Sequence, residues 1–348
     1  MWITRCKNDG ESPKFDLRKL FLITEFTKHS MIENPGNNTP KTAVLLVNMG
    51  APVSEQGMKV FLRRLFRDKA IVQAPEPVRR LLAATVSRMR YKSSWRKYLT
   101  IGGSPLLNSM NKTAAELQKL LSSNYQVRCA FSYSEPFIEN EITELTLDGF
   151  EDFVIISMYP QSGFTTTGSI AAVLKRIQET NNGLRIRFVE DYHDNPFFVQ
   201  FWTNLISRKI TETGYRHPIL LFSAHAIPQS GIKRGDSYPL RIQKSAQLIA
   251  DALNLPYRVG YQSKLGPVKW TEPSTSEVLK KLSANNVSEI IIVPLSFVNE
   301  NLETCYDLDI KLIPYSINIL KIGKICRIHI PESDNTLVRM YRSFIEPY

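Results

Sequence analysis

The stretch Ile219-Leu220-Leu221-Phe222-Ser223-Ala224-His225-Ala226-Ile227-Pro228 joins an unbroken apolar run to small residues, a histidine and a proline. Such a run, closed by a turn signal, is typical of a buried parallel strand. In an α/β sheet the carboxyl ends of the strands open into the ligand crevice, so the next polar side chain, His225, is delivered to a site. An imidazole titrates near neutral pH, which suits it to moving protons. These residues alone leave two interpretations open: a group that handles protons in a site, or a histidine hydrogen-bonded into a loop.

The pattern of apolar strand followed by helix continues in both directions from this stretch. Further strands are predicted at 43–48, 127–131, 153–158, 185–189, 257–261 and 289–294. Alternating strands and helices with short connections predict parallel sheets with helices on both faces. The strands are too many for one compact sheet, and the alternation restarts near residue 180. The predicted fold class is therefore α/β, with two Rossmann-like doubly wound domains and a ligand cleft between them.

The length of 348 residues allows two domains, each with a full core. We expect an N-terminal domain over 41–180 and a C-terminal domain over 181–332. A last helix within 333–348 can pack back on the N-terminal domain. Residues 1–40 differ from the rest: they lack the apolar core of a signal peptide, and their acidic residues argue against a transit peptide. We expect them to be a poorly ordered extension without a role in function.

The charge balance, formally +11, favours an acidic partner, which includes anionic lipid headgroups and carboxylate-bearing small molecules. No nucleic-acid module and no dinucleotide or P-loop motif is present. Basic residues cluster with Leu, Met, Tyr and Trp in 79–97, a pattern typical of an amphipathic surface helix. Peripheral contact with the inner face of a membrane and a simply solvated helix face both remain open for this segment.

The four cysteines, Cys6, Cys129, Cys305 and Cys326, lie far apart without a C-x-x-C pair. This spacing argues against structural zinc, an iron–sulfur cluster and a disulfide framework. It fits a reducing compartment, and we expect a cytoplasmic protein.

Acidic residues gather after the strand predicted at 289–294. If a helix begins near Leu302, Glu303 and Asp307 share one face and Glu300 lies close to the same line. Carboxylate oxygens alone suit a hard divalent ion in transit, whereas a closed zinc site uses sulfur and imidazole ligands. The acidic stripe is either solvated or visited by a cation.

Several motifs of this chain closely resemble the ferrochelatase family, in the order expected for it. In the second half these are 223–228, 235–239, Tyr261-Gln262-Ser263-Lys264-Leu265-Gly266-Pro267 with Trp270, and Ser296-Phe297-Val298-Asn299-Glu300-Asn301-Leu302-Glu303-Thr304. The first half agrees through Val47-Asn48-Met49-Gly50-Ala51-Pro52, 61–68, 101–106 and Tyr159-Pro160-Gln161.

This resemblance implies a metal-inserting lyase of terminal haem synthesis, which places ferrous iron in protoporphyrin IX or coproporphyrin III. It implies that His225 is the catalytic base or presents the metal, and that Glu303 is its partner. The metal would meet His225, Glu303, Asp307 and Glu300. Iron is a substrate here, no tightly bound cofactor is expected, and the chain is similar to bacterial members without an iron–sulfur cluster. The resemblance also implies the porphyrin-binding residues, which are Met49, Tyr133, Gln262, Ser263, Trp270, Phe297 and Asn301.

The chain departs from the family at four positions. Asn301 stands where the family usually has histidine, Ser162 where it has tyrosine, Ser132 where it has arginine, and Lys311 where it has an acid. These changes touch the substrate pocket and the metal path and leave His225 intact. Two other functions stay open: a porphyrin- or haem-binding protein with weak or no chelatase activity, and a chelatase that places cobalt or nickel in another tetrapyrrole.

Overall fold

The computed structural model describes residues 41–264, 266 and 268–346, and the predicted extension 1–40 lies outside these ranges. Within them, eight strands form two four-stranded sheets in which every neighbouring pair is parallel. The first sheet has the order β2-β1-β3-β4, built from Tyr125–Phe131, Thr42–Asn48, Asp152–Ser157 and Arg185–Val189. The second sheet has the order β6-β5-β7-β8, built from Tyr257–Gln262, Ile219–His225, Glu289–Val293 and Lys324–Arg327. The predicted α/β class with two doubly wound sheets is confirmed.

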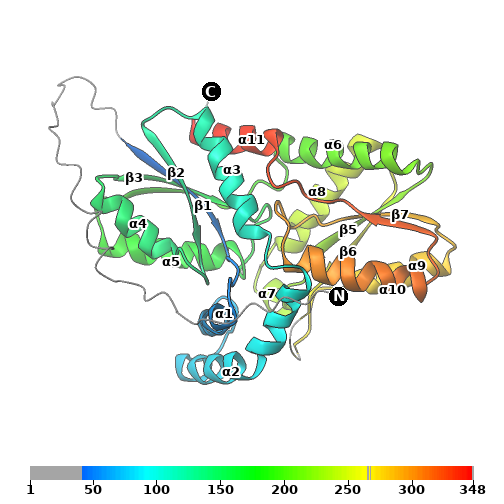
Figure 1. Ribbon diagram of the computed structural model, residues 1–348, viewed down its shortest axis with the longest axis horizontal. Helices are drawn as coiled ribbons and strands as arrows, with labels where there is room; N and C mark the ends of the chain where they lie inside the picture. Colours follow the sequence, from blue (N-terminus) through cyan, green and yellow to red (C-terminus); the bar gives the residue numbers. More distant parts are fainter. Residues whose placement is uncertain (1–40, 265, 267, 347–348) are drawn as a thin grey trace, which may run out of the picture. The chain divides into compact units, whose positions relative to one another are not determined.

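Helices connect the strands and cover the sheets (Figure 1). The helices of the first half are α1 (Glu55–Arg67), α2 (Glu76–Thr100), α3 (Leu106–Leu120), α4 (Ile138–Leu147) and α5 (Thr167–Thr180). The later helices are α6 (Pro196–Thr213), α7 (Gln229–Lys233), α8 (Tyr238–Leu253), α9 (Thr275–Ala284), a π-helix (Glu303–Leu312), α10 (Ile313–Asn318) and α11 (Asn335–Ile345). In Figure 1, α4 lies beside α5 and α11 lies beside α6.

The two sheets share one strand order, in which the first strand of each half, β1 or β5, lies between the next two strands of that half. The direction in which strands are added reverses there, and the carboxyl ends of the strands at such a reversal form a ligand crevice. Each sheet therefore has one crevice, between β1 and β3 in the first and between β5 and β7 in the second.

The change from the first sheet to the second lies after residue 189. The predicted boundary near residue 180 would have placed the strand at 185–189 in the C-terminal domain. Instead β4 pairs with β3 along Asp152 to Ile156. The turn after α5 is thus a connection within one sheet, and α6 then crosses to the second sheet. The last helix, α11, packs against α6 and also against α3 of the first half.

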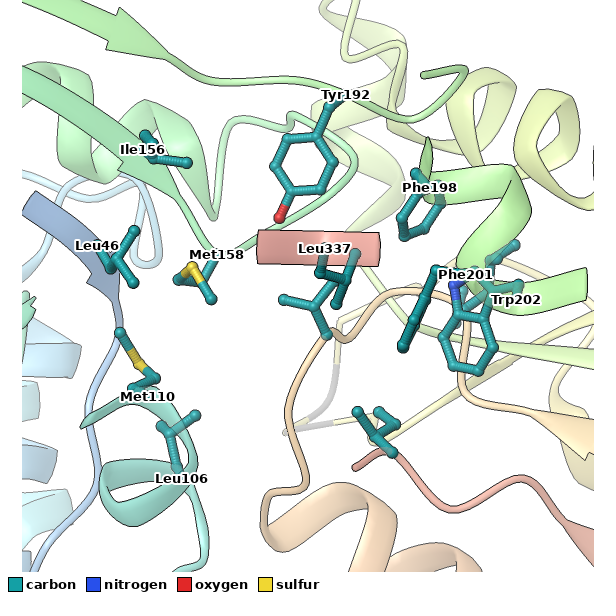
Figure 2. Packing of buried hydrophobic residues seen from close by; sticks show 14 of the residues in the cluster. Leu46, Leu106, Met110, Ile156, Met158, Tyr192, Phe198, Phe201, Trp202 and Leu337 are labelled. Carbon is teal, nitrogen blue, oxygen red and sulfur yellow. The ribbon is translucent and has the colours of Figure 1, made fainter. Parts of the chain in front are cut away.

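One continuous hydrophobic cluster joins the two sheets. It contains Leu46 of β1 and Phe222 of β5, both fully buried, and the aromatic side chains of α6. Figure 2 shows Leu46 and Met110 near the first sheet, with Leu337 of α11 between them and Trp202. Separate clusters fill the outer layers under α4 and α5 and under α9. Because the strands are buried on both faces, they read as continuous apolar runs in the sequence.

Helix α2 contains the basic segment 79–97, whose pattern predicted a surface helix, and it extends to Thr100. The basic segment 79–97 is therefore wholly helical. Helix α1 begins at the N-cap Ser54, whose hydroxyl accepts a hydrogen bond from the Gly57 N–H at 3.0 Å, and α1 packs against α2.

Candidate active site

A cavity of about 830 Å³ opens at the carboxyl ends of strands from both sheets. From the first sheet, Met49 follows β1, Tyr133 follows β2 and Gln161 follows β3. From the second sheet, His225 ends β5 and Phe297 follows β7. Both crevices thus open into one cavity, whose volume is within the range of about 300–1,000 Å³ found for small-molecule sites.

The turn after β1 fixes Met49 at the cavity. Gly50 follows it with φ +85°, and a Cβ there would collide with the Ser134 hydroxyl and the Phe131 side chain. The carbonyl of Met49 accepts a hydrogen bond from the Tyr133 N–H at 3.0 Å. The ends of β1 and β2 are therefore tied together, and each delivers one side chain to the cavity.

His225 is half-buried at the end of β5, and its backbone N–H donates to the Ser296 hydroxyl at 2.9 Å. Burial lowers the pKa of His225, and the negative charge of Asp307 opposes this shift. The imidazole is consequently neutral at neutral pH and able to accept a proton.

The π-helix supplies Glu303 and Asp307 to the same cavity, as predicted, and also Lys311. π-helical turns are rare and frequently occur at functional sites. Burial raises the pKa of Glu303 to about 7, with the charge of Asp307 adding to the rise and that of Lys97 opposing it. A carboxyl group with this pKa holds or releases a proton near neutral pH.

Asp307 is held from two sides. Its carboxylate accepts a hydrogen bond from the Ser263 hydroxyl at 3.0 Å and pairs with the Lys311 ammonium at 3.5 Å. Ser263 follows β6 in the left-handed region with φ +65°, which is uncommon for a residue other than glycine. The lysine at position 311 thus neutralises the carboxylate one turn before it.

The cavity brings together most of the predicted site residues. Those that line it are His225, Glu303, Asp307, Met49, Tyr133, Gln262, Ser263, Trp270 and Phe297. Within the described part of the chain, the buried Gln262 Nε2 and Trp270 Nε1 atoms have no hydrogen-bond partner. Two residues of the predicted site, Glu300 and Asn301, do not line the cavity.

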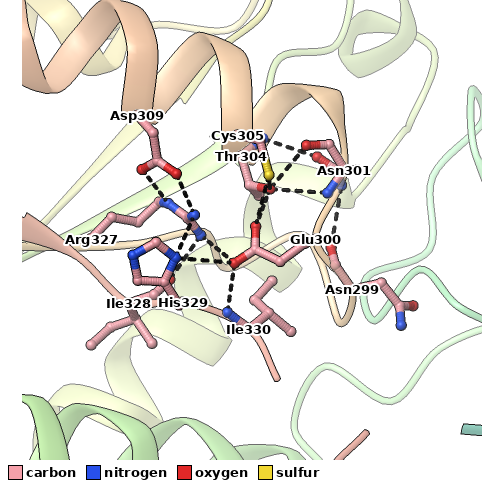
Figure 3. Close-up of polar contacts among 10 residues, drawn as sticks. All are labelled: Asn299, Glu300, Asn301, Thr304, Cys305, Asp309, Arg327, Ile328, His329 and Ile330. Carbon is pink, nitrogen blue, oxygen red and sulfur yellow. Dashed lines mark hydrogen bonds and ion pairs between the residues drawn. The ribbon is translucent and has the colours of Figure 1, made fainter. Parts of the chain in front are cut away.

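Glu300 was expected to share the acidic face with Glu303, and this is wrong. Its carboxylate pairs at 2.7 Å with Arg327, whose side chain is 1% exposed, and accepts the Ile330 N–H at 2.8 Å (Figure 3). Burial by itself raises the pKa of Glu300, but hydrogen bonding to His329 and the charge of Arg327 lower it to about 2. The π-helix begins only at Glu303, so Glu300 lies before it and points elsewhere.

Asn301, a predicted porphyrin-binding residue, does not line the cavity, and its side chain caps the start of the π-helix. Its side-chain oxygen accepts the Thr304 N–H at 3.0 Å, and the Thr304 hydroxyl accepts the Asn301 N–H at 3.0 Å. This reciprocal pair satisfies backbone donors that a helix start leaves free.

The predicted four-ligand metal set is not assembled. Across residues 41–264, 266 and 268–346, no three His, Cys, Asp or Glu side chains are grouped so that they could hold a metal ion. Glu300 is engaged by Arg327, and Asp307 by Ser263 and Lys311. Of the four predicted ligands, His225, Glu303 and Asp307 line the cavity and Glu300 does not.

Sequence reasoning left several cavity residues out of the predicted site. Arg90 and Lys97 of α2 line it, and both belong to the basic segment 79–97, which was the signal available in the sequence. Further lining residues are Tyr159, Gln161, Thr165, Thr166, Lys264 and the apolar Leu62, Leu65 and Phe66 of α1.

The other two departures from the family pattern lie beside the cavity. Ser132 and Ser162 do not line it. The Ser132 N–H donates to the Asn48 carbonyl at 3.0 Å, and the Ser162 N–H donates to Asp191 at 2.8 Å. Both residues therefore contribute to loops that support the cavity.

A family model described as Ferrochelatase matches residues 41–347. The chain belongs to the ferrochelatase family. A relative named Ferrochelatase from Aquifex aeolicus is 33% identical over 77% of this chain and 87% of its own length. Ferrochelatases from Wolbachia (36% identical, 78% of this chain, 89% of the relative) and Rickettsia bellii (35%, 79% and 78%) are similarly related. Membership supports a metal-inserting enzyme of haem biosynthesis.

Solved structures agree with the ferrochelatase assignment at the level of the fold. SirB from Bacillus subtilis, solved with Fe³⁺, superposes with a TM-score of 0.54 at 12% identity, over 87% of this chain and 95% of SirB. A cobalt complex of the sirohydrochlorin chelatase SirB from Bacillus subtilis subspecies spizizenii gives 0.53 at 11% identity, over 87% and 95%. At this identity the likeness shows the two-sheet chelatase fold alone.

Proposed function

We propose that this chain inserts Fe²⁺ into protoporphyrin IX or coproporphyrin III as a ferrochelatase. The observation that carries the proposal is that one cavity is lined by His225, whose pKa burial lowers, and by Glu303, whose pKa burial raises to about 7. Groups whose pKa values have been moved towards the working pH are typical of sites that transfer protons.

The reaction requires proton acceptors, because a porphyrin loses two pyrrole N–H protons as it takes up a metal. Neutral His225 accepts a proton from the macrocycle. Glu303 receives or releases a proton near pH 7, and the charge of Asp307 raises the pKa of both His225 and Glu303. Each proton acceptor is thus a side chain of the cavity.

The rest of the cavity suits a flat, largely apolar ligand with carboxylate arms. Met49, Trp270 and Phe297 provide apolar and aromatic surface. Arg90 and Lys97 provide positive charge for the propionates. The porphyrin ring would rest against Met49, Trp270 and Phe297, with its carboxylates towards α2.

We further propose a cytoplasmic protein, without a tightly bound cofactor or iron–sulfur cluster, that touches a membrane surface through α2. In the described residues no helix has the length and apolar character to cross a bilayer. Helix α2 exposes Leu81 (70%) and Met89 (77%) beside the exposed Arg80 and Arg88, a combination that suits an anionic interface. Sedimentation with phosphatidylglycerol vesicles tests this, and a Leu81→Ser/Met89→Ser double variant should lose binding.

The deciding experiment follows porphyrin fluorescence under anaerobic conditions with Fe²⁺. Wild type should quench the fluorescence over many turnovers, and His225→Ala should not. Protoporphyrin IX and coproporphyrin III assayed side by side identify the substrate.

A porphyrin- or haem-binding protein with weak or no chelatase activity is the second candidate. The observation that favours it is the neutralisation of Asp307 by Lys311 in a cavity without a set of metal ligands among the described side chains. Stoichiometric porphyrin binding without turnover would support it. Turnover with Co²⁺ on another tetrapyrrole, and none with Fe²⁺, would indicate a sibling chelatase.

A further inference from the structure

Arg327, the last residue of β8, joins two carboxylates, one just before the π-helix and one within it. Its Nη1 atom contacts Glu300 at 2.7 Å, while its Nε and Nη2 atoms bind the two oxygens of Asp309 at 2.7 and 2.6 Å (Figure 3). The arginine side chain is 1% exposed. A planar guanidinium that serves two carboxylates in this way fixes direction as well as distance.

The Glu300 carboxylate carries this contact to the first turn of the π-helix. Its second oxygen accepts a hydrogen bond from the Thr304 hydroxyl and lies 3.6 Å from the Cys305 sulfur. Thr304 follows Glu303 directly in the chain, and it is fully buried. A displacement of Glu300 would therefore move the backbone that presents Glu303.

Asp309 anchors the middle of the same helix from the side away from the cavity. Glu303, Asp307 and Lys311 line the cavity, whereas Asp309 does not and binds Arg327 instead. The π-helix thus has one face towards the cavity and another towards the buried guanidinium group of Arg327.

We propose that Arg327 is a positioning residue, whose ion pairs with Glu300 and Asp309 hold the π-helix so that Glu303 and Asp307 face the cavity. This inference rests on the proposed function, because the groups it positions are those that transfer protons there. It assigns Glu300 to support of the site in place of metal binding.

The test compares Arg327→Met with a matched control, Arg185→Met. Arg185 also binds both oxygens of an aspartate, Asp152, at 2.5 and 2.7 Å. It is exposed, however, and it lies at the amino ends of β3 and β4, away from the cavity. For Arg327→Met, kcat for metal insertion should fall about 10- to 100-fold, as for other supporting partners of a site, with KM for porphyrin nearly unchanged. Arg327→Lys should recover part of kcat, and Arg185→Met should change neither constant.

A second variant and a second readout guard against misfolding. Glu300→Gln keeps the size of the side chain while it weakens the pair with Arg327. Alkylation of Cys305 by iodoacetamide at fixed pH, followed by peptide mass spectrometry with buried Cys129 as internal reference, reports on the first turn of the π-helix. Both variants should alkylate Cys305 several-fold faster than wild type.

Wild-type kcat in folded Arg327→Met and Glu300→Gln would overturn the positioning role. A rise in KM for porphyrin without a fall in kcat would also overturn it, because misplacement of Glu303 acts on the chemical step. Absence of metal insertion by wild type would instead overturn the proposed function. In that case the alkylation of Cys305 still tests the positioning role, and an unchanged alkylation rate in the two variants would show that Arg327 does not hold the π-helix.

Discussion

The two sheets have the same strand order but contribute different chemistry to the cavity. The strand ends of the first sheet supply Met49, Tyr133 and Gln161, which carry no charge: burial raises the pKa of Tyr133 well above its ordinary value. The second sheet supplies His225 and, through the π-helix, the carboxyl group of Glu303. A repeated topology thus provides two equivalent crevices, and the residue types at the strand ends decide which of them carries groups suited to proton transfer.

The connections differ as well. Between β1 and β2 the chain forms three helices, α1, α2 and α3, whereas between β5 and β6 it forms two, the short α7 and the longer α8. The longer connection between β1 and β2 supplies apolar and basic lining residues of the cavity: Leu62, Leu65, Phe66, Arg90 and Lys97. Under the proposed function we expect the first sheet to act mainly in binding and the second mainly in proton transfer.

The largest expected effect comes from His225→Ala. Because this removes the proton acceptor of the second sheet, kcat should fall about 100- to 10,000-fold. Met49→Ala, at the equivalent place after β1, should raise KM for porphyrin about 3- to 10-fold through lost apolar contact, with little change in kcat. Anaerobic initial rates over a range of porphyrin concentrations measure both. Similar losses of kcat in the two variants would contradict a division of labour between the sheets.

A smaller effect is expected for Glu303→Gln, read out as stability against pH. The folded pKa of about 7 lies above the ordinary value of 4.5, so the folded state binds the proton more tightly than the unfolded state. Wild type therefore loses stability as pH rises from about 4.5 to 7, and the glutamine variant does not share this loss. The variant should match wild type near pH 5 and exceed it at pH 8 by up to about 3 kcal/mol.

Urea unfolding at the two pH values measures this difference, and Glu141→Gln, a buried glutamate of the first sheet's outer layer paired with Arg128, serves as the control. A variant of Glu303 that is less stable than wild type at pH 8 would show that this carboxyl group is favoured in its ionised form.

The smallest expected effect is that of Asn301→His. Since Asn301 caps the π-helix, its replacement should cost about 1 kcal/mol in free energy of unfolding, and Asn301→Asp should cost less. We expect no gain in kcat, because this side chain does not line the cavity. Thermal unfolding and initial rates measure the two quantities. A clear rise of kcat in Asn301→His would show that position 301 reaches the reacting groups.

Local patterns in the sequence were sufficient for the α/β class and for most of the site. The apolar runs of β1, β3, β5 and β7 are buried on both faces, and such strands are readable without knowledge of their partners. The polar residues that follow them, His225 above all, reach the cavity because parallel strands end at one edge. The motifs at 223–228 and 296–304 then carried the family assignment.

Tertiary structure decided what depends on partners distant in the chain. The sequence determined that β4 is a strand, but only its pairing with β3 placed it in the first sheet. Likewise the sequence determined that Glu300, Glu303 and Asp307 are acidic and close together in the chain. From the sequence, all three were therefore candidate metal ligands. The buried Arg327 on β8 binds Glu300, Ser263 and Lys311 bind Asp307, and burial raises the pKa of Glu303 to about 7. The charge of a side chain follows from its residue type, whereas its availability depends on which counter-charge the fold brings against it.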